Sequence, residues 1–452
     1  MKKLEKRAII CLALAAILLL GLGIFAFRFV VSGDDWASFP ANQHLFQNGV
    51  LNRGRVLDVN GEVLSDSGES GRTYNSSYRI RTATLHVVGD TEGQIGSGAL
   101  SQFADRLSGF NLFTGVYSIN GEGRDLYLTI DAELSAVANE ALAGRKGTVG
   151  VYNYETGEIL CLVSSPNYDP VDPPDIEGDD SYDGVYINRF LSATYTPGSI
   201  FKLVTTAAAL ENKSDLDDWE FVCDGSFEIG EDVITCPSAH GTVDIAEALS
   251  VSCNGAFAQL TLELGGDLLE RYTEKLGLTD SISINGISTA KGSFTFPNQG
   301  DANLAWAGIG QYEDLVNPCS MMVYMGAIAN GGVPVLPQIV SKVTTAGGFP
   351  LSLYLKKSGS RMLSEDAAAE LAELMHNNVV TNYGEGNYPG LDLCAKSGTA
   401  EVGGDLEPNA WFVGFIRNEE YPLAFVVLVE NGGSGSSVAG SIANKVLQAA
   451  VD

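Results

Sequence analysis

A serine and a lysine lie three residues apart in the segment PGSIFK, residues 197–202. Pro and Gly before an apolar run are typical of a helix start, so we expect Ser199 and Lys202 to share one face of a helix. The Lys202 amine could then accept the proton of the Ser199 hydroxyl, and the N-terminus of the helix would favour nearby negative charge. This pair is suited to acyl transfer through a serine ester, although Ser199 could also serve only as a helix N-cap.

Two later segments could complete such a site. Ser252 and Asn254 follow the helical pattern DIAEALSV, and their hydroxyl and amide could pass a proton and bind a substrate amide. The segment KSGT, residues 396–399, follows the apolar LDLCA on a predicted strand and supplies an amine, two hydroxyls and a glycine. Considered alone, the first segment could be a polar helix end and the second a turn.

The segments around these motifs predict strands at both ends of a helical region. From Asp125 the sequence predicts a strand, a helix and a hairpin formed by GTVGVYN and EILCLVS. A second hairpin, residues 410–430, and a final helix close the chain, and the interior between the two hairpins is mostly helical. This order predicts an α+β fold with one antiparallel sheet backed by a helical lobe.

The first 31 residues predict a membrane anchor. An uncharged run of 20 residues from Ala8 to Phe27 is long enough to cross a bilayer as a helix. The run is longer than the apolar part of a signal peptide and ends without a small-x-small site, so we favour an uncleaved anchor over a cleaved signal. Basic residues precede the run, and the positive-inside rule then places the N-terminus in the cytoplasm and residues 32–452 outside.

We predict two domains beyond the anchor at residues 1–31. Asn60-Gly61 between two short β-like runs predicts a tight hairpin. Gly-rich stretches with little helical periodicity follow, and the pattern changes near residue 123. We therefore expect a small β-rich pedestal at residues 32–123 and the main α+β domain at residues 124–452.

The composition excludes several classes of protein. Lys plus Arg number 27 against 56 Asp plus Glu, a formal net charge of −29, so most of the surface would repel nucleic acid. The 45% of hydrophobic residues can form a large core and excludes a mainly disordered chain. The four His and seven Cys show no H-E-x-x-H, H-x3-H or C-x2-C spacing, so the sequence predicts no metal site.

Cys223 and Cys236 bracket the segment FEIGEDVIT, which predicts two short strands around a Gly-Glu-Asp turn. A location outside the membrane permits a disulfide. We predict one between these cysteines, because the segment has few apolar residues with which to order itself. Two buried thiols are the alternative.

Together, the motifs identify a family. S-x-x-K, S-x-N and K-[ST]-G in this order form the signature set of the penicillin-recognising serine acyltransferases. Over nearly its whole length the sequence resembles a class B penicillin-binding protein, a membrane-anchored peptidoglycan D,D-transpeptidase with the penicillin-binding and serine β-lactamase-like fold. Other segments that carry the resemblance are RGRVLD (53–58), LTID (128–131), SPNYDP (165–170), YTPGSIFK (195–202), HGTVD (240–244), GIGQ (308–311) and NGG (330–332). The sequence departs from the family pattern after GIGQ, where Tyr312-Glu313-Asp314 stands at a place usual for Gly.

The resemblance implies catalytic roles for the first motifs. Ser199 would attack the penultimate D-Ala carbonyl of a stem peptide that ends in D-Ala-D-Ala, with Lys202 as the base. Ser252 and Lys396 would relay protons, and Asn254 would bind the substrate amide. The acyl group would then pass to an amine of a neighbouring strand.

The resemblance also implies how the end of the substrate is held. The hydroxyls of Ser397 and Thr399 would bind the terminal carboxylate, with the unhindered Gly398 between them. Backbone N–H groups of Ser199 and Thr399 would form the oxyanion hole. β-Lactam antibiotics would acylate the same serine, and the reaction needs no metal or organic cofactor.

Three other functions stay open. A β-lactamase or β-lactam sensor would share the motifs, but the pedestal and the gap of 144 residues from Ser252 to Lys396 favour the synthetic enzyme. A bifunctional enzyme would need a glycosyltransferase domain, for which about 90 residues between anchor and main domain are too few. The chain could instead act chiefly as a non-catalytic activator of a SEDS-type glycosyltransferase, the membrane partner that the resemblance implies.

Overall fold

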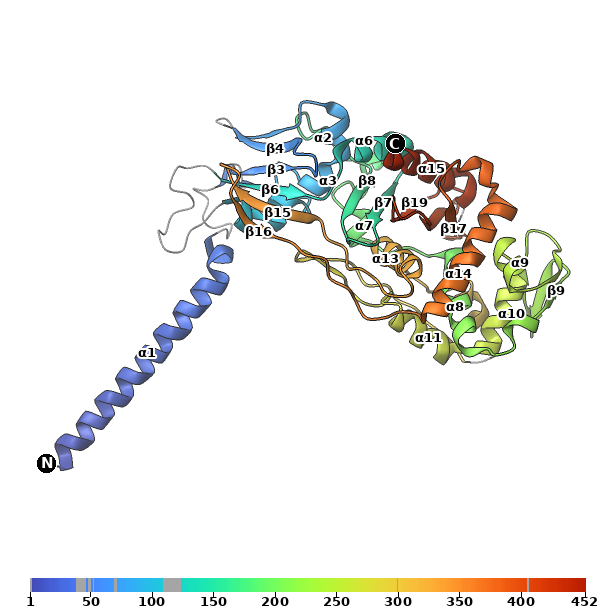
Figure 1. Ribbon diagram of the computed structural model, residues 1–452, viewed down its shortest axis with the longest axis horizontal. Coiled ribbons are helices and arrows are strands. Elements are labelled where there is room, and N and C mark those ends of the chain that lie inside the picture. Colours follow the sequence, from blue (N-terminus) through green and yellow to red (C-terminus); the bar gives the residue numbers. More distant parts are fainter. Residues whose placement is uncertain are drawn as a thin grey trace.

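The computed structural model describes residues 2–37, 46–47, 50–51, 53–68, 71–108, 123–298, 300–404 and 406–452. Figure 1 shows a long N-terminal helix, α1 (Lys2–Ala37), a β-rich unit next to it, and a larger unit in which helices surround a second sheet. Most of residues 32–52, and the stretch just before the domain boundary predicted at residue 123, lie outside the described residues.

Helix α1 is long and apolar enough to cross a membrane. The candidate span runs from Glu5 to Val31, and the rest of the chain does not bury it. Its large apolar side chains from Ile9 to Val31 are more than half exposed, except Phe29, which is partly buried. A helix that is apolar on all sides suits lipid better than water, so the helix has the length and composition of the predicted anchor.

The β-rich unit contains a six-stranded sheet in the order β16-β15-β6-β3-β4-β5. Its strands are β3 (Arg55–Leu57), β4 (Val63–Gly68), β5 (Gly71–Tyr74), β6 (Arg124–Leu128), β15 (Val340–Thr345) and β16 (Pro350–Leu353). Neighbouring strands are antiparallel except β3 and β6, which are parallel. The hairpin predicted at Asn60-Gly61 joins β3 to β4, so that prediction is confirmed.

Two of these strands come from far along the chain. β15 pairs with β6 although more than 200 residues separate them in the sequence. The sheet thus combines strands from both sides of the domain boundary predicted between residues 123 and 124, and that division of the chain stays a prediction.

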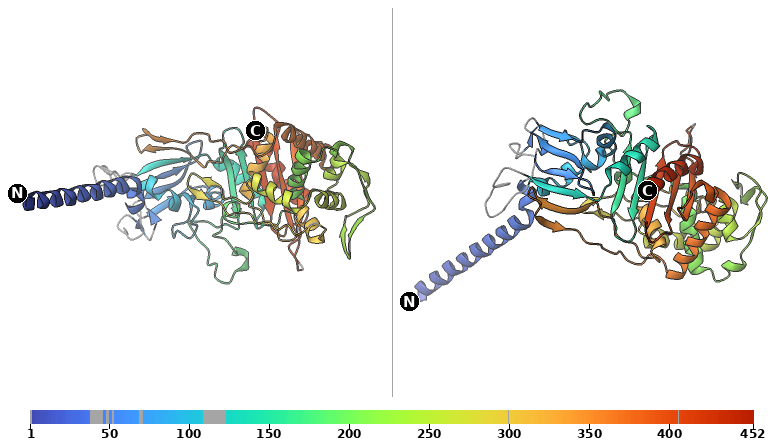
Figure 2. Two further views of the ribbon diagram at one scale, coloured as in Figure 1. Left: turned by 90° about the horizontal axis from the view of Figure 1, so that it is seen from below. Right: turned by 45° about the horizontal axis from the view of Figure 1, so that its top comes forward.

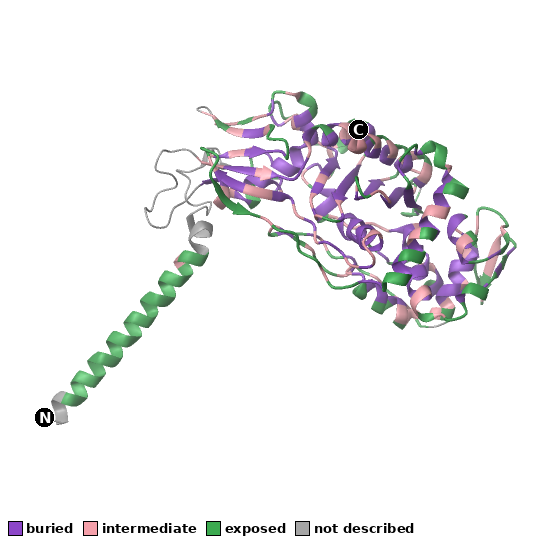
Figure 3. Ribbon diagram, viewed as in Figure 1, coloured by how far each residue is buried: buried purple, intermediate pink, exposed green. Residues whose placement is uncertain are grey.

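The larger unit contains a five-stranded antiparallel sheet in the order β17-β18-β19-β7-β8. Its strands are β7 (Gly147–Asn153), β8 (Ile159–Ser165), β17 (Leu393–Ala400), β18 (Asn409–Ile416) and β19 (Leu423–Val429). Every residue of β18 and β19 is buried, because helices cover both faces of the sheet (Figure 3). The predicted antiparallel sheet with strands from both ends of the main domain is confirmed.

Successive residues of the central strands pack against different helices. Trp411 and Val413 belong to the same hydrophobic cluster as α13 (Pro318–Ala329). Phe412 belongs to the cluster formed with α6 (Ala132–Leu142) and α15 (Gly440–Val451). Figure 2 shows these helices beside the sheet in two further views. Side chains along a strand alternate between the two faces of the sheet, and helices cover both faces here. The run AWFVGFI is therefore apolar throughout, without polar residues at every second position.

The helical lobe is formed, as predicted, by segments between the two hairpins. Besides α13 it contains α8 (Lys202–Asn212), α9 (Ile245–Ser250), α10 (Asn254–Leu264), α11 (Gly266–Lys275), α12 (Ala302–Gly308) and α14 (Glu365–Asn378). Asp244 and Glu247 form a reciprocal capping box at the start of α9. This cap fixes the start of the helix that precedes the S-x-N motif.

Two small sheets lie beside the lobe, at the end of the molecule far from α1 (Figure 1). β9 (Phe221–Cys223) pairs with β12 (Gly241–Val243), and β10 (Ser226–Ile229) pairs with β11 (Asp232–Thr235). The second pair is the hairpin predicted between the two cysteines. Other short elements are β1 (Phe46–Gln47), β2 (Val50–Leu51), α2 (Tyr78–Ala83), α3 (Leu85–Val88), α4 (Ala99–Gln102), α5 (Ala104–Ser108), α7 (Arg189–Ser192), β13 (Ser283–Ile284) and β14 (Ile287–Ser288).

Candidate active site

The three sequence motifs meet at one cavity of about 580 Å³. Ser199 lies in a 3₁₀ turn, η3 (Gly198–Phe201), that leads into α8, the S-x-N motif lies between α9 and α10, and K-[ST]-G lies on β17. The cavity is lined by Ser199, Thr235, Pro237, Val251, Ser252, Asn254, Trp306, Ile309, Gln311, Ser397, Thr399 and Glu401. The fold therefore brings together motifs that are far apart in the sequence.

Glycines allow the turn that carries Ser199 to approach its neighbours closely. Gly198 has a φ of 57° and donates its N–H to the carbonyl of Gly310 at 2.7 Å. A Cβ on Gly310 would lie 2.1 Å from the carbonyl oxygen of Gly198, and a Cβ on Gly398 would lie 2.9 Å from that of Pro197. Turn η3 therefore packs directly against both the GIGQ loop and β17.

The loop that departs from the family pattern lies at the same site. Gln311 lines the cavity, and Tyr312 has a φ of 65°, in the left-handed region that glycine adopts more easily. Asp314 is buried, and this burial raises the pKa of its carboxyl well above the usual value. The segment therefore keeps a turn that suits glycine although it has no glycine there.

Lys202 is completely buried behind the cavity. Its Nζ donates to the carbonyl of Ser252 at 2.7 Å, to Ser252 Oγ at 3.1 Å and to Asn254 Oδ1 at 2.8 Å. Burial lowers the pKa of this amine to about 7, because the charged form loses its water. A large fraction of Lys202 is therefore neutral near pH 7 and able to accept a proton.

Lys396 approaches the same hydroxyl from β17. Its Nζ donates to Ser252 Oγ at 3.1 Å and to the carbonyl of Ser397 at 3.0 Å. Burial, and to a lesser degree the charge of Lys202, hold the pKa of Lys396 well below its usual value. Two buried amines thus meet at one hydroxyl group, which can pass a proton between them.

Asn254 and Ser397 are oriented by neighbours that no sequence motif indicated. Asn254 Nδ2 donates to the carbonyl of Thr235 at 2.9 Å. Tyr383 OH accepts the N–H of Ser397 at 2.8 Å and lies 3.0 Å from Ser397 Oγ. Thr399 Oγ1 accepts a backbone N–H from the segment after β19 at 3.3 Å. Thr235 and Tyr383 were missed because they belong to a hairpin and a helix end with unremarkable sequences.

All eight residues predicted for the site lie at it. Ser199, Ser252, Asn254, Ser397 and Thr399 line the cavity, Lys202 and Lys396 are buried beside it, and Gly398 packs on turn η3. Within the described residues, no hydrogen bond joins Ser199 Oγ to the Lys202 amine, which instead contacts the S-x-N motif. Such bonds often shorten only when substrate binds.

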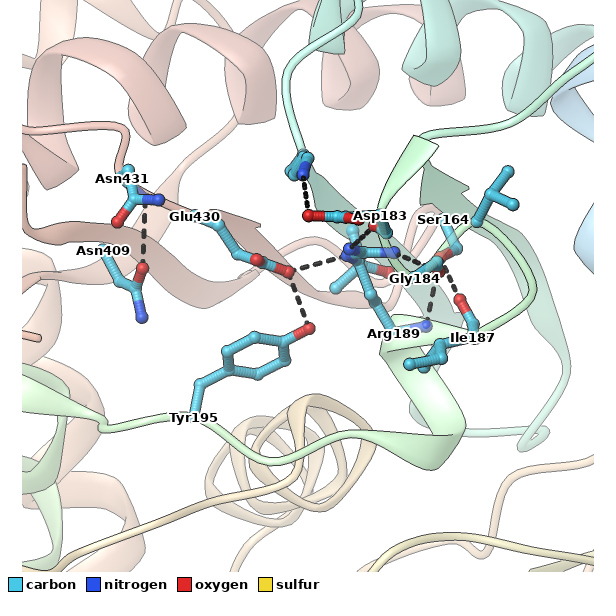
Figure 4. A network of polar contacts seen from close by, with 12 residues as sticks. Ser164, Asp183, Gly184, Ile187, Arg189, Tyr195, Asn409, Glu430 and Asn431 are labelled. Atoms are coloured by element: carbon cyan, nitrogen blue, oxygen red, sulfur yellow. Dashed lines mark hydrogen bonds and ion pairs between the residues drawn. The ribbon is translucent and has the colours of Figure 1, made fainter. Parts of the chain in front are cut away.

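A polar network holds the segment that precedes turn η3 (Figure 4). Arg189 Nε donates to Glu430 Oε1 at 2.7 Å, and Tyr195 OH donates to the same oxygen at 2.9 Å. Arg189 also donates to the carbonyl of Gly184 at 2.8 Å, and only 6% of its side chain is exposed. Because Glu430 directly follows β19, the network ties this segment to the central sheet.

The predicted disulfide between Cys223 and Cys236 is wrong, since both residues are free thiols. Cys223 lies on β9, where its Sγ is 3.4 Å from His240 Nδ1. Cys236 follows β11, and its Sγ is 3.7 Å from Cys253 Sγ at the start of α10. The strands thus give each cysteine a different nearest neighbour.

The geometry of the site agrees with a comparison to known families. Residues 147–448 match the family described as the penicillin binding protein transpeptidase domain. The match covers well over half of the chain, so the chain belongs to this family, and it is a class B penicillin-binding protein.

Known relatives extend the match beyond this domain. Peptidoglycan D,D-transpeptidase PbpA of Mycobacterium tuberculosis is 28% identical, over 99% of this chain and 98% of PbpA. The structure of penicillin-binding protein A from M. tuberculosis as a penicillin G acyl-enzyme complex matches with a TM-score of 0.74 and 26% identity, over 88% of this chain and 99% of that chain. The D,D-transpeptidase domain of a peptidoglycan glycosyltransferase from Eggerthella lenta matches with a TM-score of 0.75 and 28% identity, over 88% and 98%. These likenesses confirm the predicted fold.

Proposed function

We propose that this protein is a serine-type peptidoglycan D,D-transpeptidase that crosslinks stem peptides through an acyl-enzyme on Ser199. One observation carries the assignment of roles: Lys202 and Lys396 both donate to the hydroxyl of Ser252, beside the cavity that Ser199 lines. A nucleophile next to two amines and a bridging hydroxyl suits a reaction with several proton transfers. The relatives named D,D-transpeptidases support the same activity.

The first half of the reaction forms the ester. Ser199 Oγ attacks the carbonyl carbon of the penultimate D-Ala, and its proton passes to the neutral amine of Lys202. The bond to the last D-Ala then breaks, and the leaving amine takes a proton through Ser252, with Lys396 as a further donor. Backbone N–H groups of Ser199 and Thr399 stabilise the oxyanion that forms in between.

The second half transfers the acyl group. An amine of a neighbouring stem peptide attacks the ester carbon and gives up a proton to the same relay. The ester bond breaks, and Ser199 Oγ regains its proton. β-Lactams react in the first half and block the second, because the acyl-enzyme that they form is slow to react further.

The K-[ST]-G strand binds the carboxylate at the end of the substrate in this proposal. The hydroxyls of Ser397 and Thr399 line the cavity, and the amine of Lys396 lies behind them. Gly398 keeps β17 close to the serine turn. Asn254, whose amide is already oriented by Thr235, holds the substrate amide from the opposite wall.

We further propose that α1 anchors the protein with its N-terminus in the cytoplasm and residues 32–452 outside. The basic residues before the apolar run support this orientation. In this arrangement the pedestal at residues 32–123 lies near the membrane and the transpeptidase domain at residues 124–452 reaches the wall. A SEDS-type glycosyltransferase is the proposed membrane partner.

A fluorescent penicillin tests the assignment of the nucleophile. We expect wild type to gain the mass of one penicillin, Ser199→Ala to gain none, and the control Ser360→Ala, at an exposed serine, to react like wild type. Labelling that persists in Ser199→Ala would refute the assignment. Rapid release of the label from wild type would instead favour a β-lactamase.

A further inference from the structure

Four metal-ligating side chains meet beside the active site, although none of them is part of the mechanism above. They are Cys223, Cys236, His240 and Cys253, and their Sγ and Nδ1 or Nε2 atoms all lie within 4.8 Å of one another. The spacing is C-x12-C-x3-H-x12-C, which contains neither the C-x2-C nor the H-x3-H pair by which zinc sites are usually found in a sequence. The expectation that the chain has no metal site rested on this lack of short pairs.

The distances within the cluster suit a tetrahedral ion. Around zinc, with Zn–S of about 2.3 Å and Zn–N of about 2.0 Å, two sulfurs lie roughly 3.8 Å apart and a sulfur and a nitrogen roughly 3.6 Å apart. Cys236 and Cys253 sulfurs are 3.7 Å apart, and Cys223 Sγ is 3.4 Å from His240 Nδ1. Two separate pairs thus have the spacing that one central ion requires.

The start of α10 supports two of the sulfurs. Cys236 Sγ accepts the backbone N–H of Gly255 at 3.3 Å, and Cys253 Sγ accepts that of Ala256 at 3.5 Å. N–H groups at a helix N-terminus stabilise thiolates, the form in which cysteine binds metals. Thiols that only filled a core would have no need of such donors.

Each ligand comes from a different part of the local structure. Cys223 is on β9, Cys236 follows the β10–β11 hairpin, His240 immediately precedes β12, and Cys253 is the residue before α10. The pairing of β9 with β12 has only three residue pairs and that of β10 with β11 only four, so backbone pairing alone holds these short strands weakly. An ion shared by all four would fasten them to the lobe.

We propose that Cys223, Cys236, His240 and Cys253 bind one structural zinc ion. On binding, the three thiols release their protons to solvent and the imidazole binds through a neutral nitrogen, so the site carries a net charge of −1. Four protein ligands close the coordination shell, which leaves no position for a substrate or a reactive water. The ion therefore stabilises the fold and takes no part in the chemistry.

The site borders the catalytic groups on two sides. Cys253 lies between Ser252 and Asn254 in the S-x-N motif, and Cys236 follows Thr235, whose carbonyl accepts from Asn254. The zinc ion would thus hold both ends of the contact between Thr235 and Asn254. This arrangement makes the cysteines positioning residues for the motif.

Metal analysis of the full-length protein tests the proposal. The chain is purified in detergent after growth with zinc, dialysed against metal-free buffer, and measured by inductively coupled plasma mass spectrometry. We expect about one zinc per chain in wild type and about tenfold less in Cys223→Ser and His240→Ala, because each removes one ligand. Cys161→Ala, at a buried free cysteine in β8, is the matched control and should keep its zinc.

Cobalt gives a second measurement that does not depend on the variants folding. Wild-type protein reloaded with Co²⁺ should show the intense visible bands of a tetrahedral ion and the ultraviolet charge-transfer bands of bound thiolates. Wild type that holds no zinc, a disulfide among these cysteines found by peptide mapping, or a six-coordinate cobalt spectrum would each overturn the proposal. Zinc retained equally by all the variants would do the same.

Discussion

The hydroxyl of Ser252 is the point at which the two buried lysines of the site meet. The backbone of Ser252 has a φ of 55°, in the left-handed region. This conformation turns the chain between α9 and α10. Lys202 and Lys396 reach the Ser252 hydroxyl from different elements, and burial together with the charge of Lys202 lowers the pKa of the Lys396 amine. One short side chain thereby joins the helical lobe to the sheet.

Replacing Lys202 by alanine should slow acylation strongly. In our proposal the Lys202 amine accepts the proton of Ser199, and burial lowers the pKa of this amine to about 7, so that much of it is neutral near pH 7. We expect the acylation rate constant for a fluorescent penicillin to fall by about 10²- to 10⁴-fold. Stopped-flow labelling measures it, circular dichroism checks the fold, and Lys291→Ala at an exposed lysine is the control. Unchanged kinetics would show that another base acts.

Replacing Gly398 by alanine should also impair acylation, for a steric reason. The added Cβ would lie 2.9 Å from the carbonyl of Pro197 and 3.0 Å from Ile200, so β17 would have to move away from the serine turn. We expect acylation to slow by about tenfold or more, since small displacements of reacting groups reduce rates steeply. Gly386→Ala, where nothing lies within 4 Å of the added Cβ, is the control, and equal rates in both variants would contradict the steric account.

The residues of the site were predictable where a short motif contains them. Ser199 and Lys202 are fixed relative to each other by one helical turn, and the order of the three motifs identified the family. Tyr383 was not predictable, because its contact with Ser397 depends on how a helix end packs on a strand. The cysteine cluster was missed because its four members converge only after strands and helices have paired.

The segment before turn η3 depends on a buried ion pair. Arg189 and Tyr195 both donate to Glu430 in a place with little solvent. Removal of one partner leaves the other charge buried without compensation, which is far worse than loss of an exposed pair. The network therefore connects the stability of the sheet to the position of the turn that carries Ser199.

Glu430→Ala should lower the free energy of unfolding by about 3 kcal/mol, because it leaves the Arg189 guanidinium buried without its carboxylate. The matched control is Glu373→Ala, whose carboxylate pairs with Arg417 but is 70% exposed, and we expect a loss below about 1 kcal/mol. Urea unfolding followed by fluorescence gives both values. Similar losses in the two variants would mean that burial does not determine how much each ion pair contributes to the free energy of unfolding.

His86 makes the contact between α3 and the loop before α7 sensitive to pH. Its buried Nε2 donates to the carbonyl of Val185 at 2.7 Å, and burial lowers the pKa of the ring to about 4. Above about pH 6.5 the ring is neutral in both folded and unfolded chains. Below that value the unfolded chain binds a proton first, so stability falls until the folded ring also titrates.

We expect this histidine to remove about 3 kcal/mol of stability as the pH falls from about 7 to 4. His86→Gln should show a correspondingly smaller decline over the same range, and the difference from wild type isolates the histidine from the carboxyl groups that also titrate there. His376→Gln is the control for loss of a histidine in general. Parallel stability curves for wild type and His86→Gln would contradict the prediction.

Elements were predictable where local pattern and final packing agree. The hairpins of the central sheet, the capped helices and the hairpin at Asn60-Gly61 all follow from periodicity and turn residues. The six-stranded sheet was not predictable in full, because β15 and β16 are far along the sequence from its other strands. Nothing in the sequence of those strands indicates which sheet edge they pair with.

At the scale of the whole molecule, α1 and the catalytic cavity lie at separate places and share no group. A chain that lacks residues 1–33 should therefore stay in the supernatant after ultracentrifugation and still react with fluorescent penicillin at the rate of the full-length protein. The full-length chain should sediment with membranes. Loss of labelling in a truncated chain that is folded by circular dichroism would show that the anchor contributes to the site.

β15 and β16 are synthesised long after the other strands of the six-stranded sheet. This delay determines the order in which the protein can fold during synthesis. More than 200 residues must leave the ribosome after β6 before its partner β15 appears. During that interval the edge of β6 carries unpaired backbone groups and can accept a strand from another chain. The N-terminal unit therefore completes its sheet only after most of the larger unit has been made, contrary to the usual order of domain folding. Chains that stop before residue 340 leave this edge open, and we expect them to aggregate more than the full-length chain does.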